Sequence, residues 1–350
     1  MSDVQPLASP RAAGRAFPTG ELVRVGERSA SYEDVVLASA LMGEWNGFRG
    51  WTTEALHRQL SQEVDGGALR RAAEGFRRVR HLEAGEDLRK WLSDRAISRT
   101  QWESHLRREV TMAGTEVDES SLADVPDDLG EALLVDSYCR RFWETGAHRL
   151  VRWMAATQLM ADDTTDSSAV AHVDLDDMTL ALVQLNRREA GERLTTLANG
   201  REALDRAATR VGSESAVEGA IARHWMKWSE LTLDICHLAS ESAAREAMSC
   251  AVEDLMTPAE IAHRGHSTVN RQVWEAGDLG EQLTPLLLSS VVDQPVGPFL
   301  LSDEWCIAWV REKKAGDTSD PKVRAEVVAT LVDEALDGVS RGKTTWRGVA

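Results

Sequence analysis

The chain has 350 residues, of which 43% are hydrophobic and 28% are charged, a composition typical of a soluble globular protein. Aspartate and glutamate (57) outnumber lysine and arginine (40), so the formal net charge is -17. This charge repels phosphate backbones and disfavours a nucleic-acid-binding protein. No apolar run reaches the roughly 18 residues of a membrane helix, and residues 1–20 lack the apolar core of a secretory signal. We therefore expect a cytoplasmic protein without nucleic-acid or membrane partners.

The cysteine and histidine residues do not form a metal-binding pattern. His263 and His266 are three residues apart, but no cysteine or carboxylate completes a zinc set at ligand spacing. Residues 277–280 (Gly-Asp-Leu-Gly) lack the lysine of a phosphate-binding loop. Wide spacing also argues against a disulfide scaffold for the four cysteines, which are Cys139, Cys236, Cys250 and Cys306. We expect no metal and no cofactor.

The first two thirds of the chain are predicted to be helical. Residues 1–28 carry scattered prolines and arginines without periodicity, which predicts a flexible arm. Residues 29–228 show the apolar spacing of helices and form the predicted helical domain. Within it, residues 161–177 are rich in aspartate but lack the spacing of a calcium loop, so we expect a solvated acidic linker.

Capping residues and glycines mark the predicted ends of these helices. Ser31 can cap a first helix, and Ser98 with Gln101 forms a capping box for another. Gly146 is expected to separate two helices, and the pair Asn199-Gly200 is expected to interrupt a third.

Residues 68–82 are the first strongly periodic segment, with apolar side chains on one helical face. Arginines lie mostly outside that face: Arg70, Arg71, Arg77, Arg78 and Arg80. Two interpretations stay open for them. They form either a solvated helix face or a docking surface for an acidic peptide or protein segment.

The pattern changes at Trp228, after which strands alternate with helices and the fold class becomes α+β. Residues 231–238 alternate with the period of a strand. Thr257 and Glu260 flank a proline in a capping box that starts a short helix. The remaining predicted elements are helices over 241–254, 284–292 and 320–338 and strands over 272–275, 299–301 and 305–310.

This order of elements resembles the parvulin-type peptidyl-prolyl isomerase domain, here over residues 229–316. Five short motifs carry the resemblance: Cys236-His237-Leu238, Gly277-Asp278-Leu279-Gly280, Gln282-Leu283-Thr284-Pro285, Val296-Gly297-Pro298-Phe299 and Trp305-Cys306-Ile307. The resemblance implies a small α/β domain preceded by a helical region like that of parvulin-containing chaperones. Independently of the resemblance, the C-terminal segment, residues 317–350, contains a predicted helix with apolar side chains to bury, so we expect this helix to return and pack on the helical domain.

Taken over residues 65–346, the chain is most similar to cytosolic parvulin-related proteins that act as peptide maturation factors for ribosomally made peptide natural products. Residues 242–247 and 320–324 are among the points of similarity. The resemblance implies that a precursor peptide or another protein segment is the partner, with biosynthetic enzymes as further partners.

The departures from the parvulin pattern bear on catalysis. The positions of the family's pocket methionine and phenylalanine hold Leu283 and Leu287, and the second histidine position holds Cys306. Only His237 remains of the catalytic set, so both His237 and Cys306 are vestigial candidates and no catalytic residue is assigned. We predict a non-catalytic peptide-binding accessory protein. The alternative is an active cytosolic peptidyl-prolyl isomerase and chaperone.

The predicted peptide site is an apolar groove formed by Leu283, Leu287, Phe299 and Trp305, or an exposed edge strand of the small sheet. A competing interpretation places these four side chains in the closed core of the small domain.

Overall fold

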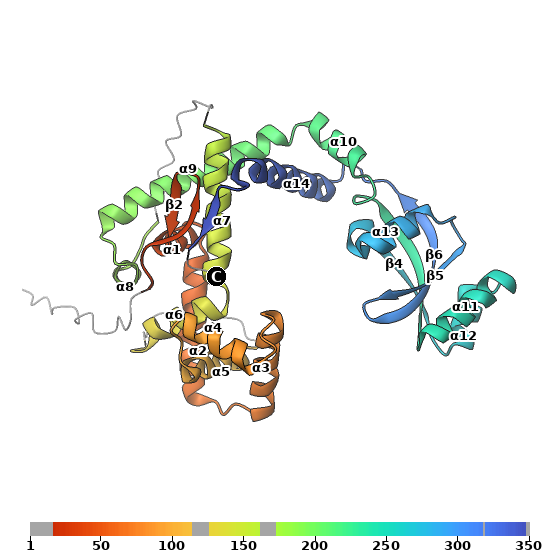
Figure 1. Ribbon diagram of the computed structural model, residues 1–350, viewed down its shortest axis with the longest axis horizontal. Coiled ribbons are helices and arrows are strands. Elements are labelled where there is room, and N and C mark those ends of the chain that lie inside the picture. The colour runs from red at the N-terminus through yellow and green to blue at the C-terminus, as the bar shows by residue number, and fades with distance from the viewer. Residues whose placement is uncertain (1–16, 114–125, 162–172, 318, 348–350) are drawn as a thin grey trace, which may run out of the picture. The chain divides into compact units, whose positions relative to one another are not determined.

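The structure is a computed structural model that describes residues 17–113, 126–161, 173–317 and 319–347 (Figure 1). The fold is α+β, mainly helical with small antiparallel sheets, as the sequence predicts. The chain divides into two compact units, residues 1–207 with 335–350 and residues 208–334. Each unit has its own sheet and its own hydrophobic core.

The first unit is built mainly from helices around a core in which Trp45 and Trp143 are almost fully buried. The predicted capping boxes at Ser31 and at Ser98 with Gln101 are confirmed, and each closes the first turn of its helix. The helices are α1 (Tyr32–Leu41), α2 (Glu44–Ser61), α3 (Gly66–Val79), α4 (Gly85–Asp94), α5 (Arg99–Met112), α6 (Leu129–Cys139), α7 (Phe142–Leu159), α8 (Asp177–Leu182) and α9 (Arg187–Val211).

Where the sequence predicts a flexible arm over residues 1–28, the described part, residues 17–28, is ordered. Phe17 is buried, and its ring packs edge-to-face on Trp143 with centroids 5.2 Å apart. Strand β1 (Glu21–Val25) pairs with β2 (Arg28–Ser31) and with β7 (Thr344–Trp346) in the order β2-β1-β7. The prediction is wrong here because β1 depends on a partner strand far along the chain, which local periodicity does not reveal.

Two glycines that predict helix breaks instead lie inside helices. Gly146 is in α7, where a Cβ atom would lie 2.2 Å from Cγ1 of Val35 in α1. Gly200 is in α9, where a Cβ atom would lie 3.1 Å from Cβ of Trp153 in α7. Both glycines therefore permit close packing of two helices. The break that separates α6 from α7 falls at residues 140–141 instead of at Gly146.

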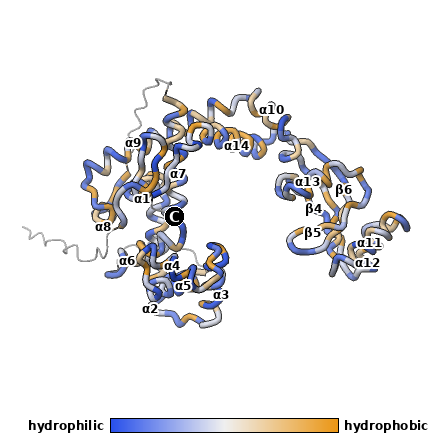
Figure 2. Tube along the Cα trace, viewed as in Figure 1, coloured by the Kyte–Doolittle hydropathy of each residue, from blue (hydrophilic) through white to orange (hydrophobic). Residues whose placement is uncertain are grey.

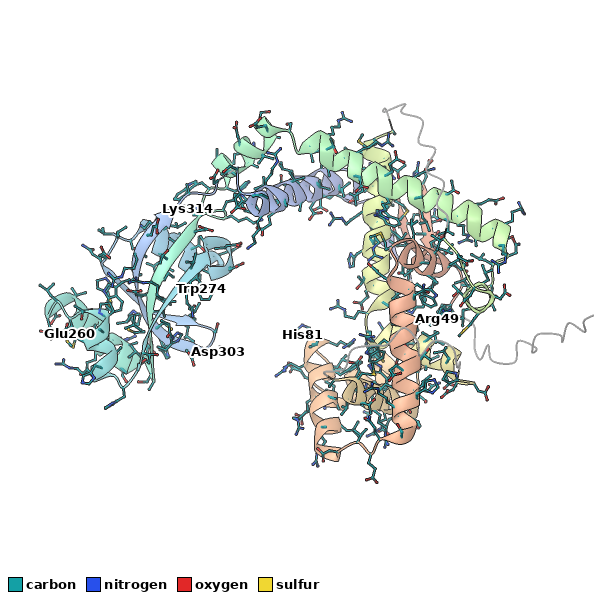
Figure 3. The ribbon with its side chains drawn as sticks, turned by 180° about the vertical axis from the view of Figure 1, so that it is seen from behind. Arg49, His81, Glu260, Trp274, Asp303 and Lys314 are labelled. Carbon is teal, nitrogen blue, oxygen red and sulfur yellow. The ribbon has the colours of Figure 1, made fainter. Side chains whose placement is uncertain are left out.

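The predicted acidic linker, residues 161–177, lies mostly outside the described residues, since 162–172 are not described. Its described end, residues 173–177, packs on the first unit through Leu175, while its aspartates are exposed as predicted for a solvated segment. Leu175 is buried, and Asp176 caps α8 while pairing with Arg49 of α2, which is labelled in Figure 3.

The second unit is a four-stranded antiparallel sheet with helices on both faces (Figure 1). The elements follow the predicted order of strand, helix, short helix, strand, helix and strand, with the last region forming two strands. The sheet order is β4-β3-β6-β5. The elements are β3 (Glu230–Leu238), α11 (Glu241–Glu253), α12 (Pro258–Arg264), β4 (Val269–Glu275), the 3-10 helix η2 (Ala276–Leu279), α13 (Gly280–Ser289), β5 (Pro295–Leu301) and β6 (Glu304–Lys314).

The two faces of this sheet are covered by different helices, because side chains alternate along each strand. On one face, Cys306, Ala308 and Val310 of β6 share a core with α13. On the other face, Ile307 and Trp309 share a core with α11 and α12.

The C-terminal segment, residues 317–350, contains α14 (Pro321–Ser340) and strand β7. Val327 of α14 is fully buried against Val217 and Ile221 of α10 (Glu214–Arg223). This packing places α10 in the compact unit that begins at residue 208, before the start of the sheet.

Among the described residues, no helix combines the length and the apolarity that crossing a membrane requires. Figure 2 shows hydrophobic and hydrophilic residues mixed along the long helices α9 and α14.

Candidate functional site

The parvulin-like candidates His237 and Cys306 lie side by side at one end of the sheet. The antiparallel register places His237, near the end of β3, opposite Cys306 of β6. His237 Nδ1 lies 3.4 Å from Cys306 Sγ and 2.7 Å from Glu304 Oε2. Sequence reasoning missed Glu304, although it precedes Cys306 by two residues on the same strand.

The Cys306 thiol is held in its neutral form. The side chain is fully buried, and this burial, with the charge of Glu304 as the next cause, raises its pKa to about 11. Its Sγ–H donates to the Glu304 carbonyl oxygen over 3.5 Å. A neutral, enclosed thiol is a poor nucleophile.

The four residues of the predicted groove do not line one groove. Leu287 is fully buried and Phe299 is 7% exposed, and both belong to the core between the sheet and α13. Leu283 is partly buried against that core. Trp305 lies on the opposite face of the sheet, because it is adjacent to Cys306 and strand residues alternate. For Leu287 and Phe299, the structure agrees with the alternative of a closed core.

The sheet has two edges, and they differ in composition. The edge strand β5 contains Pro295 and Pro298, which cannot donate a backbone hydrogen bond. The other edge strand, β4, contains no proline, and its residues 270–273 are exposed. A strand with an open side and no proline can accept an additional strand through backbone hydrogen bonds. The prolines of β5 are the sequence signal that distinguishes the two edges.

Strand β4 is anchored to the sheet by an ion pair as well as by its backbone. Arg271 of β4 donates to both oxygens of Asp234 of β3 over 2.7 and 2.9 Å. Arg311 of β6 donates to the same carboxylate over 2.7 Å. The hydrogen bond from Arg271, assisted by Arg311, lowers the pKa of Asp234 despite its burial. Strand β4 is therefore held against β3 by side-chain as well as backbone hydrogen bonds.

The indole of Trp274 flanks this edge on the α13 face, where it packs against the sheet core (Figure 3). Val273, its neighbour on the opposite face, is 66% exposed. An added strand would thus find an aromatic side chain on one side and an exposed aliphatic one on the other.

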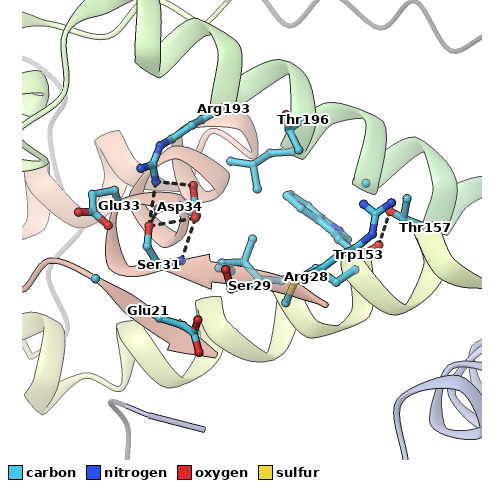
Figure 4. A pocket seen from close by; sticks show the side chains of 16 residues that line it. Glu21, Arg28, Ser29, Ser31, Glu33, Asp34, Trp153, Thr157, Arg193 and Thr196 are labelled. Atoms are coloured by element: carbon cyan, nitrogen blue, oxygen red, sulfur yellow. Dashed lines mark hydrogen bonds and ion pairs between the residues drawn. The ribbon is translucent and has the colours of Figure 1, made fainter. Parts of the chain in front are cut away.

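A separate cavity of about 490 Å³ lies in the first unit, bounded by β2, α7 and α9 (Figure 4). Arg193 of α9 donates to Ser31 Oγ over 2.9 Å and to Asp34 Oδ1 over 3.1 Å. Glu33 also lines the cavity, and its Oε2 has no hydrogen-bond partner among the described residues. The lining combines apolar walls such as Trp153 with charges of both signs, and nothing in the sequence pattern brings these elements together.

No group of three or more histidine, cysteine, aspartate or glutamate side chains suited to a metal ion occurs in the part of the chain that the structure describes.

No family model matches the chain, and no curated protein matches it. A solved structure from Campylobacter jejuni is similar at 13% identity, covering 66% of this chain and 86% of that chain, with a TM-score of 0.19. It comes from work describing the virulence factor PEB4 and the periplasmic protein Cj1289 as two structurally related SurA-like chaperones. This degree of similarity carries no argument about the site, which is interpreted from its own geometry.

Proposed function

We propose that this chain is a non-catalytic, chaperone-like protein that holds an extended peptide along the open edge of β4. The main evidence is that β4 is an edge strand without proline and is exposed over residues 270–273. It is also anchored to β3 through the hydrogen bond between Arg271 and Asp234. Strand addition relies on backbone hydrogen bonds and needs little side-chain chemistry. It is therefore compatible with the loss of a catalytic set.

The peptide class follows from the sequence resemblance to parvulin-related peptide maturation factors. We propose that the bound segment is a precursor peptide of a ribosomally made natural product, handled in the cytoplasm, with biosynthetic enzymes as further partners. Affinity in the micromolar range, about -8 kcal/mol, is expected because an extended peptide loses conformational entropy when it docks.

Isomerase activity is the second candidate, and it rests on the adjacency of His237 and Cys306. Two observations speak against it. The neutral Cys306 thiol replaces the second histidine of the family, and Leu287 fills the core instead of lining an open pocket. Turnover of a prolyl peptide by the wild type, lost in His237→Ala, would establish the alternative.

The test uses peptides that co-purify with the protein from its native host and are identified by mass spectrometry. The most abundant peptide is then synthesised with a fluorescent label.

The variants follow from the geometry of the strand. Adjacent residues of an antiparallel strand point their N–H groups alternately to the partner strand and away from it. Since β3 and β4 pair without a bulge, one of Gln272 and Val273 directs its N–H to the open edge.

We expect the two variants Gln272→Pro and Val273→Pro to behave differently. One loses a hydrogen bond to β3 and has a lower melting temperature. The other keeps its melting temperature and binds the labelled peptide at least tenfold more weakly, as measured by fluorescence anisotropy. His237→Ala is the matched control and should change affinity less than about fivefold, or 1 kcal/mol. If the variant with the unchanged melting temperature binds like the wild type, the β4 edge is not the site.

A further inference from the structure

A groove in the first unit gathers positive charge in a strongly negative protein. Helices α3, α4 and α5 lie together in the first unit (Figure 1). Their side chains line a cavity of about 520 Å³. Among the described residues that line it, Glu103 is the only one with a carboxylate, and it pairs with Arg99 over 2.8 Å. Five arginines line it, and we call this the arginine groove: Arg70 and Arg77 of α3, Arg89 of α4, and Arg99 and Arg107 of α5.

Three of the five guanidinium groups are not held by a hydrogen bond or an ion pair in the described part of the protein. Arg77 is held by the carbonyl oxygens of Leu82 and Glu83. Arg70, Arg89 and Arg107 are exposed and make no hydrogen bond or ion pair with any residue that the structure describes. They come from three different helices, so they surround the groove instead of forming a single solvated helix face.

The floor of the arginine groove is apolar. Leu92, Trp102 and Leu106 are buried beneath it and belong to the core that α3, α4 and α5 share. Leu69 and Leu88 are partly buried and line its sides. An apolar floor with cationic rims is complementary to an amphipathic segment that carries carboxylates beside its apolar side chains.

We propose that the arginine groove docks an acidic amphipathic peptide segment of a partner protein. Guanidinium groups bind carboxylates through two parallel hydrogen bonds, and the leucine and tryptophan floor accepts the apolar face. A nucleic acid would match the arginines but not this floor, and the chain's net charge of -17 opposes a long polyanion. The inference does not depend on the proposed function, because the residues and the mode of binding differ from those at β4.

The experiment measures binding of a fluorescein-labelled 18-residue model helix to the full chain by anisotropy. One peptide carries leucines at helical spacing flanked by glutamates, and its matched partner has every glutamate replaced by glutamine. We expect the wild type to bind the glutamate peptide in the micromolar range and the glutamine peptide at least tenfold more weakly. We also expect the affinity to fall as salt is raised, because exposed ion pairs are screened.

The groove variant combines Arg70→Glu, Arg89→Glu and Arg107→Glu and should lose at least tenfold in affinity. Its control makes the same change in charge at exposed positions of α3 and α4 that do not line the groove: Arg71→Glu, Arg78→Glu and Lys90→Glu. The control should stay within threefold of the wild type. The melting temperature of each variant shows whether it is folded. If the triple glutamate variant of the groove unfolds, the same three arginines are replaced by glutamine instead.

Several results would overturn the proposal. One is that the wild type binds neither peptide at 100 µM, and another is that it binds both peptides equally. A third is that the control variant loses as much affinity as the groove variant. Tighter binding of a 20-nucleotide single strand, lost in the groove variant, would make the groove a nucleic-acid site. A doubled mass in light scattering, abolished by the groove variant, would identify a second copy as the occupant.

Discussion

At the scale of single residues, Cys306 shows how burial determines the chemistry of a site. A thiol with a pKa of about 11 is ionised in about one molecule in a thousand at pH 8, whereas an ordinary thiol is ionised in about one in four. We therefore expect iodoacetamide to modify Cys306 at least about a hundredfold more slowly than the partly exposed Cys250.

A time course of alkylation at pH 8, resolved by peptide mass spectrometry, measures both rates in one sample. Denatured protein is the control, since all four cysteines should then react alike. Equal rates for Cys306 and Cys250 in the folded protein would mean that His237 activates the thiol, and the non-catalytic interpretation would be lost.

Asp136 of α6 is a buried charge that joins two helices. It is fully buried, and it binds Arg108 over 2.6 Å and His105 Nδ1 over 2.8 Å, both from α5. Burial alone would raise the pKa of Asp136, but the Arg108 charge and the His105 hydrogen bond outweigh it, so the pKa is lowered.

We expect Asp136→Asn to destabilise the protein by about 3–5 kcal/mol, because it leaves the buried Arg108 without its counter-charge. The lowered pKa means that this stabilisation is fully present above the ordinary aspartate pKa of about 3.9 and is lost as the pH falls through the lower native value. Urea unfolding at pH 7 and at successively lower pH tests this. The free energies of unfolding of the wild type and of Asp136→Asn should become equal as the pH falls. A difference that stays constant with pH would contradict this explanation.

The control is Glu144→Gln, which alters the exposed pair with Arg141. It should lower the free energy of unfolding by less than about 1 kcal/mol.

At the scale of elements, glycines inside helices determine which helices can approach closely. Gly146→Ala should destabilise the first unit by about 1–3 kcal/mol, because the new methyl group would overlap Val35 of α1. The matched control is Gly191→Ala in α9, where no atom lies within 4 Å of the added Cβ. That change should be neutral or stabilise by up to about 1 kcal/mol. Thermal melts of the two variants measure the contrast, and equal effects would show that α1 and α7 adjust to the methyl group.

The same elements show what sequence could predict. The caps at Ser31 and Ser98 and the order of helices and strands along the chain of the second unit follow from local chemistry and short periods, so they were predictable. The role of Gly146 was not, because it depends on Val35, a contact distant in sequence. Trp305 is a different case, since the alternation along β6 was visible in the sequence and already separates it from Cys306.

The candidate site was predictable only in part. The parvulin motifs single out His237 and Cys306 in the sequence, and in the structure the two side chains are in contact. The open edge at β4 and the arginine groove depend on sheet order and helix packing. Arg89 and Arg107 in particular are distant in sequence from the arginines of residues 70–80, so no single periodic segment could reveal the groove.

At the scale of the whole molecule, the first unit is assembled from two distant stretches of chain. Strand β7, which pairs with β1, follows the second unit in the sequence. During synthesis, the ribosome must therefore produce residues 208–334 before the sheet of the first unit can be completed. At usual translation rates this takes on the order of ten seconds. Throughout that interval β1 presents an unpaired edge to other nascent chains, so a protein that we propose to bind strands at its edge is itself vulnerable to strand capture while it is being made.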